Sequence, residues 1–389
     1  MRSAQFLSRM ILTFIALNGA LNLALAADPN NPLAANDAPD AGALPRFMKP
    51  GMRLLYREGS SVDHGVYNLL DQPGPWNWKE GTNTGGVGFL ALDILHASPD
   101  LIAAQGRHFL MSDLQRELCT FTSVVGVQGG GDKLDPYWIN PARLANIPEG
   151  KDDTQKVNHV RYTLNGHEYN AISILQFPAG SYRSCIYDLD TGLLLSLSQQ
   201  IQTPNGKSIE HAQFVGMRQL AIPWADQPPP QWIVKGAQLT YQGSYGATGA
   251  AGMPPMTFAQ SFIVRFDDAS DGCFSLTCLT RRSQGAGAAP TESTGQQCSG
   301  SAMLNGLWIP PDIFQKLQPN QVIDEDQVLH FRTTFVGIQG NAALFVEQGP
   351  FETKQLYYNT QTGTLVGVST IAQNQIGQQF VKLQLVDQR

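Results

Sequence analysis

The residues with the most potential for chemistry lie in one short stretch near the start of the chain. Asp63, His64, Tyr67, Trp76 and Trp78 occur close together there. The two tryptophans are two positions apart beside a Pro-Gly-Pro sequence, and in an extended segment such side chains face the same way. Aromatic rings on a loop can bind a sugar or an apolar chain over a large area at low entropic cost. These five residues form the predicted ligand-binding surface. The alternative is that the stretch folds back and buries both rings.

Acidic residues near the tryptophans raise a second hypothesis, a hydrolase acting on polysaccharide. Such an enzyme needs two carboxyl groups facing each other across a cleft, and Asp63, Glu80 and Asp93 are available. The chain has no Gly-x-Ser-x-Gly, no His-Glu-x-x-His, no P-loop and no Cys-x-x-Cys-His sequence. No catalytic residue, metal ligand or cofactor is therefore assigned, and a non-catalytic role is the leading prediction.

The elements that must position this stretch occur twice along the chain. Matching segments keep the same order in both halves: 51–56 with 236–241, 137–141 with 307–311, 157–161 with 328–332, 186–192 with 357–363, and 213–215 with 379–381. We interpret this as duplication of a whole domain. The first copy spans 46–224, a Pro-rich linker spans 225–231, and the second copy spans 232–389. The stretch near 60–96 is an insertion found in the first copy only, and the second copy has its own Gly-, Ala-, Ser- and Thr-rich addition near 283–300.

Each copy has the pattern of short strands joined by turns, which is typical of an all-β fold. The sequences 187–192 and 358–363 are tight hairpins in which Asp or Asn starts the turn and Gly takes the left-handed position. One short helix is expected per copy, with Asn140 as its cap and Pro141 at its first position. Trp138 and Trp308 are predicted to anchor these helices in the core. The sequence thus predicts two tandem antiparallel β domains, each a curved sheet or sandwich.

The Tyr-Asp-x-x-Thr-Gly hairpin resembles the curved sheets of bacterial envelope lipoprotein carriers. The resemblance covers a few residues of each copy, and no function is taken from it.

Two histidines also appear as duplicates. His159 and His330 are each followed two positions later by an arginine, Arg161 or Arg332. Because a catalytic role would require both copies to be active or one to have degenerated, the duplication favours a structural role.

The first residues have the pattern of an export signal. Arg2 and Arg9 precede an apolar run, and Ala24-Leu25-Ala26 is a small-x-small cleavage site, so residues 1–26 are a predicted signal peptide and 27–45 a disordered lead. Without residues 1–26 the chain loses two arginines and no acid, and its net charge changes from −6 to −8. An acidic chain argues against nucleic-acid binding, and no later apolar run predicts a transmembrane segment. A periplasmic or secreted location is expected.

Five cysteines remain in this exported chain. Disulfides persist outside the cytoplasm, so we expect Cys119 to pair with Cys185, and Cys298 with Cys273 or Cys278. An odd count leaves one thiol for an intermolecular bond, which is compatible with an oligomer.

Three hypotheses for function follow. The leading one is an exported, non-catalytic protein that binds a carbohydrate, an apolar ligand or a protein partner in the bacterial envelope or extracellular space, on the Trp76 and Trp78 surface and the cleft between the copies. The others are the polysaccharide hydrolase and a structural surface protein.

Overall fold

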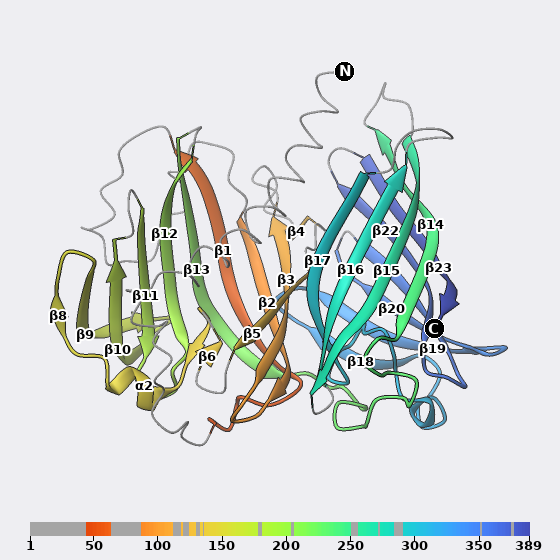
Figure 1. The fold of residues 1–389 in the computed structure, drawn as a ribbon, viewed down its shortest axis with the longest axis horizontal. Coiled ribbons are helices and arrows are strands. Elements are labelled where there is room, and N and C mark those ends of the chain that lie inside the picture. The colour runs from red at the N-terminus through yellow and green to blue at the C-terminus, as the bar shows by residue number, and fades with distance from the viewer. Residues whose placement is uncertain are drawn as a thin grey trace.

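The chain folds as an all-β protein, as its turn-rich composition predicts. A computed structural model describes residues 44–63, 87–111, 118–119, 124–129, 133–134, 136–177, 181–203, 206–249, 256–270, 273–283, 291–350, 352–374 and 377–389. Two large antiparallel sheets dominate these residues and stand beside each other (Figure 1). Within the described ranges, no helix is long and apolar enough to cross a membrane.

The first sheet is built by the first half of the chain and has 11 strands, in the order β4-β3-β2-β1-β13-β12-β11-β10-β9-β8, with β5 also paired to β3. Its strands are β1 (Met52–Asp63), β2 (Val87–Ala97), β3 (Ile102–Met111), β4 (Leu118–Cys119), β5 (Val124–Gly129), β8 (Gly150–Lys151), β9 (Gln155–Leu164), β10 (His167–Gln176), β11 (Tyr182–Asp188), β12 (Leu194–Thr203) and β13 (Gly206–Gln219). A separate two-stranded sheet pairs β6 (Lys133–Leu134) with β7 (Trp138–Ile139).

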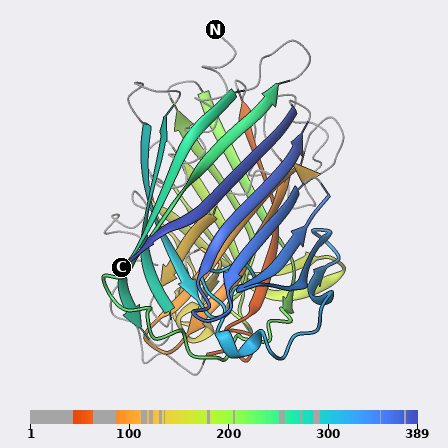
Figure 2. The ribbon, with the colours of Figure 1, turned by 90° about the vertical axis from the view of Figure 1, so that its right-hand side faces the viewer.

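The second sheet is built by the second half of the chain and has 10 strands, in the order β17-β16-β15-β14-β23-β22-β21-β20-β19-β18. Its strands are β14 (Gln238–Gly249), β15 (Met256–Ser270), β16 (Cys273–Ser283), β17 (Thr291–Gly300), β18 (Gln321–Asp326), β19 (Phe331–Gln339), β20 (Ala342–Gln348), β21 (Glu352–Asn359), β22 (Leu365–Asn374) and β23 (Gly377–Gln388). This sheet faces the viewer in Figure 2. In both sheets the first strand of the half lies beside its last strand, β1 beside β13 and β14 beside β23.

The strand register corrects one match made from the sequence. His159 lies within β9, opposite Ile172 of β10. In the second sheet, Ala343 of β20 takes the place of Ile172, because each lies opposite the tyrosine of the matching hairpin, Tyr358 or Tyr187. The residue opposite Ala343 is Ile338, so Ile338 is the counterpart of His159. His330 instead lies in the turn before β19, with a positive φ of 55°. The predicted equivalence of the two histidines is therefore wrong, because the β9–β10 hairpin extends further beyond the core than the β19–β20 hairpin does.

In each half, the segment that carries a buried tryptophan is hydrogen-bonded to a tight hairpin. The Asp188 side chain accepts from the Thr191 N–H, and Gly192 has a φ of 77°. A Cβ atom at Gly192 would collide with the Ile139 carbonyl oxygen, so this position needs glycine for its conformation and for close approach. Ile139 N–H donates to the Gly192 carbonyl at 3.0 Å. The hairpin thus seats the strand that carries Trp138.

The second half repeats this contact. Asn359 accepts from the Thr362 N–H, Gly363 has a φ of 72°, and Ile309 N–H donates to the Gly363 carbonyl at 2.9 Å. Trp308, next to Ile309, forms an isolated β-bridge with Thr364 rather than a strand.

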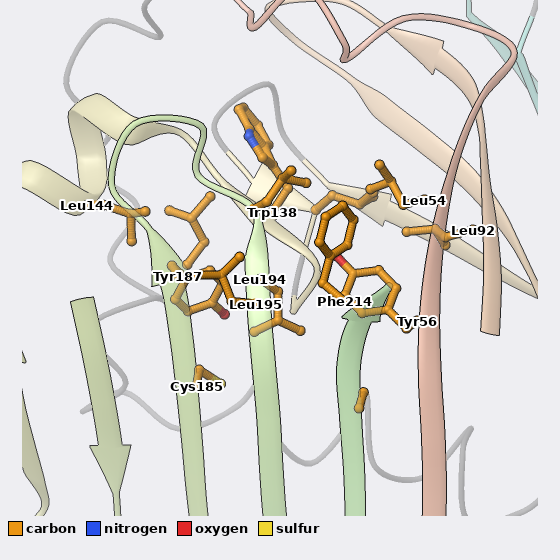
Figure 3. Packing of buried hydrophobic residues seen from close by; sticks show 14 of the residues in the cluster. Leu54, Tyr56, Leu92, Trp138, Leu144, Cys185, Tyr187, Leu194, Leu195 and Phe214 are labelled. Atoms are coloured by element: carbon orange, nitrogen blue, oxygen red, sulfur yellow. The ribbon is translucent and has the colours of Figure 1, made fainter. Parts of the chain in front are cut away.

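The core of the first half lies on one face of the first sheet, covered by β7 and the short helix (Figure 3). Trp138 is fully buried there, and its Nε1–H donates to the Thr191 carbonyl at 2.9 Å. The helix α2 (Pro141–Ala145) forms as predicted, since the Asn140 side chain accepts from the Ala142 N–H at 2.9 Å. Its counterpart η2 (Pro311–Ile313) is a single 3₁₀ turn, because Pro310 has no side-chain acceptor to cap it.

The segment that connects the halves packs on the second half. Trp224 is fully buried in the second core, donates to the Met303 carbonyl at 3.1 Å, and meets Phe345 edge-on. At the far end of the proline run, the Trp232 Nε1–H donates to the Thr362 carbonyl at 2.9 Å. The connection at 220–237 is therefore fixed at both ends rather than free to swing.

The structure contradicts the expected disulfides. Cys185, Cys278 and Cys298 are buried thiols, and no disulfide occurs among the described residues. Cys278 lies opposite Gly295 and Cys298 opposite Ser275, so the two sulfurs face opposite sides of the sheet. Cys185 lies within the first core. The pairs of Cys119 with Cys185, and of Cys298 with Cys273 or Cys278, do not form.

The two anchor tryptophans differ in one hydrogen bond, which gives a testable difference. Thr362, the counterpart of Thr191, already accepts from Trp232, and the buried Trp308 Nε1 has no hydrogen-bond partner among the described residues. Trp138→Phe should therefore cost about 1 kcal/mol more than Trp308→Phe, since the first removes a hydrogen bond that is made and the second does not. Urea unfolding of the two variants measures this. Equal losses would show that the Trp308 N–H has a partner after all.

Candidate functional site

Each large sheet has a face that bears its core and an opposite face, which we call its back, and the back of the first sheet lies against the second sheet. Successive side chains on a strand face opposite sides of a sheet. On β1, Leu54 and Tyr56 enter the core of the first half, so Arg53 and Leu55 point to the back of the first sheet. On β20, Glu347 is on the same face as Phe345, which belongs to the second core. At β20, the back of the first sheet thus packs on the core-bearing face of the second, whereas at β17 it meets the opposite face, which carries Cys298.

Two apolar clusters lie within this contact. The first cluster joins three residues of the first sheet, Leu55, Ala91 and Phe109, to Leu329 and Phe331 of the second half. The rings of Phe109 and Phe331 meet edge to face, with their centroids 5.0 Å apart. The other joins Leu95 and Ala103 to Cys298 and Met303. Parts of β1 and β2 are therefore buried on both faces, which agrees with the apolar runs Leu54-Leu55-Tyr56 and Leu90-Ala91-Leu92, all buried.

Ionic side chains also lie in this contact, and we call them the junction network: Arg53, Asp93, Arg107, Arg218, Asp324, Asp326, Glu347, Glu352 and Lys354.

Arg53 is at the centre of the network and is 2% exposed. It binds Asp93, directly opposite on β2, through two hydrogen bonds of 2.6 and 2.8 Å. Its remaining nitrogen reaches across the contact to Asp326 at 2.9 Å. One guanidinium therefore joins a carboxylate of each half, with the planar, forked geometry that arginine offers and lysine does not.

Arg218 gives a second connection on the neighbouring strand. It lies opposite Arg53, on β13. Its guanidinium binds both Asp324 oxygens, at 2.8 and 2.7 Å, and also Asp326 at 2.9 Å. Asp326 in turn accepts from the Leu329 N–H at 2.9 Å, so the same carboxylate fixes the turn that leads into β19.

Arg107 forms the third connection. Its guanidinium donates to both Glu347 oxygens, at 3.3 and 3.4 Å. The Lys354 ammonium lies 3.8 Å from Glu347 and 3.4 Å from Glu352. Two buried carboxylates of the second half therefore share one lysine.

The surroundings of most network acids favour their charged forms. Although burial alone would raise it, the positive charge of Arg53 lowers the pKa of Asp93. The Leu329 N–H and Arg53 similarly overcome burial and lower the pKa of Asp326 to about 2. Lys354 and Arg107 lower the pKa of Glu347. Glu352 is the exception, because burial raises its pKa and the nearby Glu347 adds to the effect.

This arrangement suits a mechanical role rather than catalysis. An acid held ionised by arginine and closed off from solvent is poorly suited to exchange protons with a substrate. A buried ion pair adds little net stability, because desolvation offsets the attraction, yet it penalises any other relative position of its partners strongly. The network thus fixes one orientation of the two halves. The described residues contain no group of His, Cys, Asp or Glu placed to hold a metal ion.

The predicted site residues lie at the edge of the described structure or outside it. Asp63 is the last residue of β1, and its side chain is outside the described residues. His64, Tyr67, Trp76, Trp78 and Glu80 fall in 64–86, also outside them. The expected leader, 1–26, and most of the lead at 27–45 fall outside as well.

Two expectations about the site are corrected by the described residues. The sides of β1 to β3 and β18 to β20 that face each other are packed together, so the expected cleft between the halves is filled there. Asp93, a candidate catalytic acid, is bound to Arg53. Since β1 and β2 are antiparallel with Arg53 opposite Asp93, Asp63 lies roughly 33 Å further along the sheet at 3.3 Å per residue.

Sequence reasoning missed the junction network, although a signal was present. Arg53 and Asp93 each interrupt an apolar strand, between Met52 and Leu54 and between Leu92 and Ile94. Only 15% of the chain is charged, so a lone charge inside an apolar run is informative. A charged residue buried in this way needs a partner of opposite sign.

The fold and the junction define a class of protein: an all-β protein of two large antiparallel sheets joined through a buried ion network. No known protein-family model matches the chain, and no curated protein matches it. Among solved structures, one similar structure is described as "The Structure of Intact Ap-TbpB (N and C lobes)", with 9% sequence identity, coverage of 87% of this chain and 77% of that chain, and a TM-score of 0.12. A TM-score this low carries no conclusion about fold or function.

Proposed function

We propose that this protein is exported and non-catalytic, and that it binds a ligand or partner in the bacterial envelope or extracellular space. The observation that carries the proposal is the junction network, which holds two β halves in one orientation with the ends of β1 and β14 on the same side. Strands β1 and β14 both run towards that end (Figure 1). The chain leaves the first sheet at Asp63 and returns at Val87, and it leaves the second at Gly249 and returns at Met256.

A rigid β scaffold that presents loops from one end is a common basis for binding, because the scaffold limits the ordering that binding requires. Strand β1 leads into the first-copy insertion at this end. We therefore propose that Asp63, His64, Tyr67, Trp76 and Trp78 contact the ligand, and that the ligand is a carbohydrate, an apolar molecule or a protein partner of the envelope. A cleavable signal at 1–26 would direct the chain there.

The alternatives have less support. A hydrolase would need paired carboxyl groups, and Asp93 is committed to Arg53. A structural polymer could form if the back of the second sheet bound the second half of another molecule as the back of the first sheet does within one chain. The back of the second sheet would then need the same charges. The positions there equivalent to Arg53, Asp93 and Arg107 are Gln238, Arg265 and Leu279, so this contact does not repeat from one molecule to the next.

The test is native against denaturing mass spectrometry of the full chain, expressed with its leader in a bacterial host and isolated from the envelope fraction. We expect an adduct in the native spectrum that is lost on denaturation. In a Trp76→Ala/Trp78→Ala variant the bound fraction should fall at least about tenfold, as expected when aromatic contacts worth 1.4 kcal/mol or more are removed.

The matched control is Val234→Ala, which truncates a 56% exposed side chain on the connecting segment and should retain the adduct. An adduct that survives in the double variant would place the ligand elsewhere. A bare chain with no co-purifying partner would contradict the binding role. The denatured mass also shows whether cleavage follows Ala26.

A further inference from the structure

The acids of the junction network are unequal, and Glu352 differs most from the others. Asp93, Asp324, Asp326 and Glu347 each contact at least one arginine. Among the described residues, Glu352 forms an ion pair with Lys354, at 3.4 Å, and Lys354 is shared with Glu347. Glu352 is 4% exposed, so solvent does little to screen the two carboxylates from each other.

The charges around Glu352 come from every element packed against it. Lys354 is on its own strand β21, Glu347 is on the neighbouring β20, and Arg107 reaches in from β3 of the first half. On the other side, β22 places the apolar Ala372 opposite Glu352.

The ionised network has one more acid than base: Asp93, Asp324, Asp326, Glu347 and Glu352 against Arg53, Arg107, Arg218 and Lys354. One bound proton would balance it, and Glu352 is the acid with the fewest positive contacts to lose.

We propose that the junction is a proton-operated lock, in which Glu352 takes one proton from solvent when the halves are closed and releases it when they loosen. The lock is tight while Glu352 holds the proton and loosens as the pH rises. The inference concerns the contact between the halves and does not depend on which ligand the protein binds.

The sign follows from linkage. Burial raises the pKa of Glu352 above the value of 4.5 that it has in an unfolded chain. A group with a raised folded pKa contributes stability fully below its unfolded pKa, and this contribution is lost as the pH rises through its folded pKa. Asp93, Asp326 and Glu347 have lowered pKa values and act in the opposite direction, losing stability only as the pH falls through those values.

His211 also changes protonation and must be distinguished from Glu352. Burial lowers the pKa of His211 from 6.5 to about 4. The unfolded chain therefore gains a proton before the folded one, and His211 makes stability rise between pH 4 and 6.5. His211 therefore acts with the opposite sign to Glu352. Burial also raises the pKa of Cys278 to about 12, with the same sign as Glu352, so the test must read the junction separately from the cores.

Cys298 provides a probe of junction opening that the chain already contains. It is a buried thiol between Leu95 and Ala103 of the first half and Met303 of the second. Cys185 and Cys278 lie in the separate cores of the two halves and report unfolding instead. Thiol labelling of the full chain, read at each cysteine by peptide mass mapping, distinguishes the two events.

The experiment compares the labelling rate of Cys298 in wild-type protein and in Glu352→Gln from pH 5 to 9. The labelling rate in the wild type is divided by the rate in the variant at each pH. This ratio cancels the increase in thiolate with pH, because that increase is the same in both proteins. We expect the ratio of wild type to variant to rise with pH, by up to about tenfold per unit because one proton is linked, while the ratio at Cys185 and Cys278 stays flat. Glu347→Gln is the matched control. It removes a carboxylate that Arg107 and Lys354 hold, and it should speed Cys298 labelling at every pH.

A pH-independent ratio at Cys298 would overturn the proposal, and so would a rise of equal size at all three cysteines. If Glu352→Gln does not fold, the wild-type protein alone decides: its labelling rate at Cys298, relative to those at Cys185 and Cys278, should rise with pH, and a flat relative rate would overturn the lock.

Discussion

Arg53→Met should lower the free energy of unfolding by about 3–5 kcal/mol. The substitution keeps most of the side-chain length but removes the guanidinium that joins Asp93 to Asp326 at 2.6 to 2.9 Å. Both carboxylates would remain buried, and among the described residues Asp93 would keep its ion pair with the more distant Arg107, at 3.6 Å. Urea unfolding followed by tryptophan fluorescence measures the loss. Because Arg53 links the two halves, the single transition should also separate into two.

Arg161→Met is the control for this experiment. Arg161 pairs with Glu168 at 3.2 Å, but the two side chains are 74% and 61% exposed, so its loss should cost no more than about 1 kcal/mol. A double variant, Arg53→Met with Asp93→Asn, should lose less than the two single variants together, since each removes the other's unpaired partner. If Arg53→Met and Arg161→Met unfold alike, the junction network does not hold the halves together.

Local chemistry made the fold class and several turns predictable. Asp188 with Gly192, and Asn359 with Gly363, form the expected hairpins, because short side-chain acceptors and a left-handed glycine specify such turns within a few residues. Asn140 and Pro141 gave the short helix for the same reason. The expected strands were too short, as β1 runs to Asp63 and β15 to Ser270. Ladder pairing extends strands through polar residues that propensity alone does not assign.

The junction was not predictable from local pattern. Arg53 and Asp326 are 273 positions apart, and nothing near either residue specifies the other. The equivalence of His159 and His330 failed for a related reason, since hairpin length sets register and a similar short sequence does not. Disulfide pairing failed because the parity of the cysteines says nothing about which face of a strand each thiol occupies.

The use of ions at the junction has a physical consequence. Apolar side chains alone would bury the same area but would tolerate sliding of one sheet over the other, since dispersion has little directionality. The single bond of Arg53 to Asp326 and the forked bonds of Arg218 to Asp324 are lost on a small displacement. If a ligand contacts both halves near the ends of β1 and β14, the relative position of the halves must be fixed. A directional network of ion pairs fixes this relative position, although it adds little to the free energy of unfolding.

Trp138→Ala should lower the free energy of unfolding by about 3–5 kcal/mol, the usual range for removing a large buried aromatic side chain. Trp138 is fully buried between the first sheet and the short helix, and its indole N–H satisfies the Thr191 carbonyl at 2.9 Å. The substitution opens a cavity and leaves that carbonyl without its donor. Urea unfolding followed by circular dichroism measures the change, because the variant lacks one of the fluorescent reporters.

Phe177→Ala is the matched control, since that aromatic side chain is 38% exposed and its loss should cost much less. The pattern of the loss is as informative as its size. Trp138 anchors the hairpin and helix of the first half, so the effect should appear in the transition of that half. Separation of the halves, as expected for Arg53→Met, should not accompany it. A melting temperature that barely changes would contradict the anchor role and show that Trp138 is accessible in solution, which would make it a candidate for the binding surface instead.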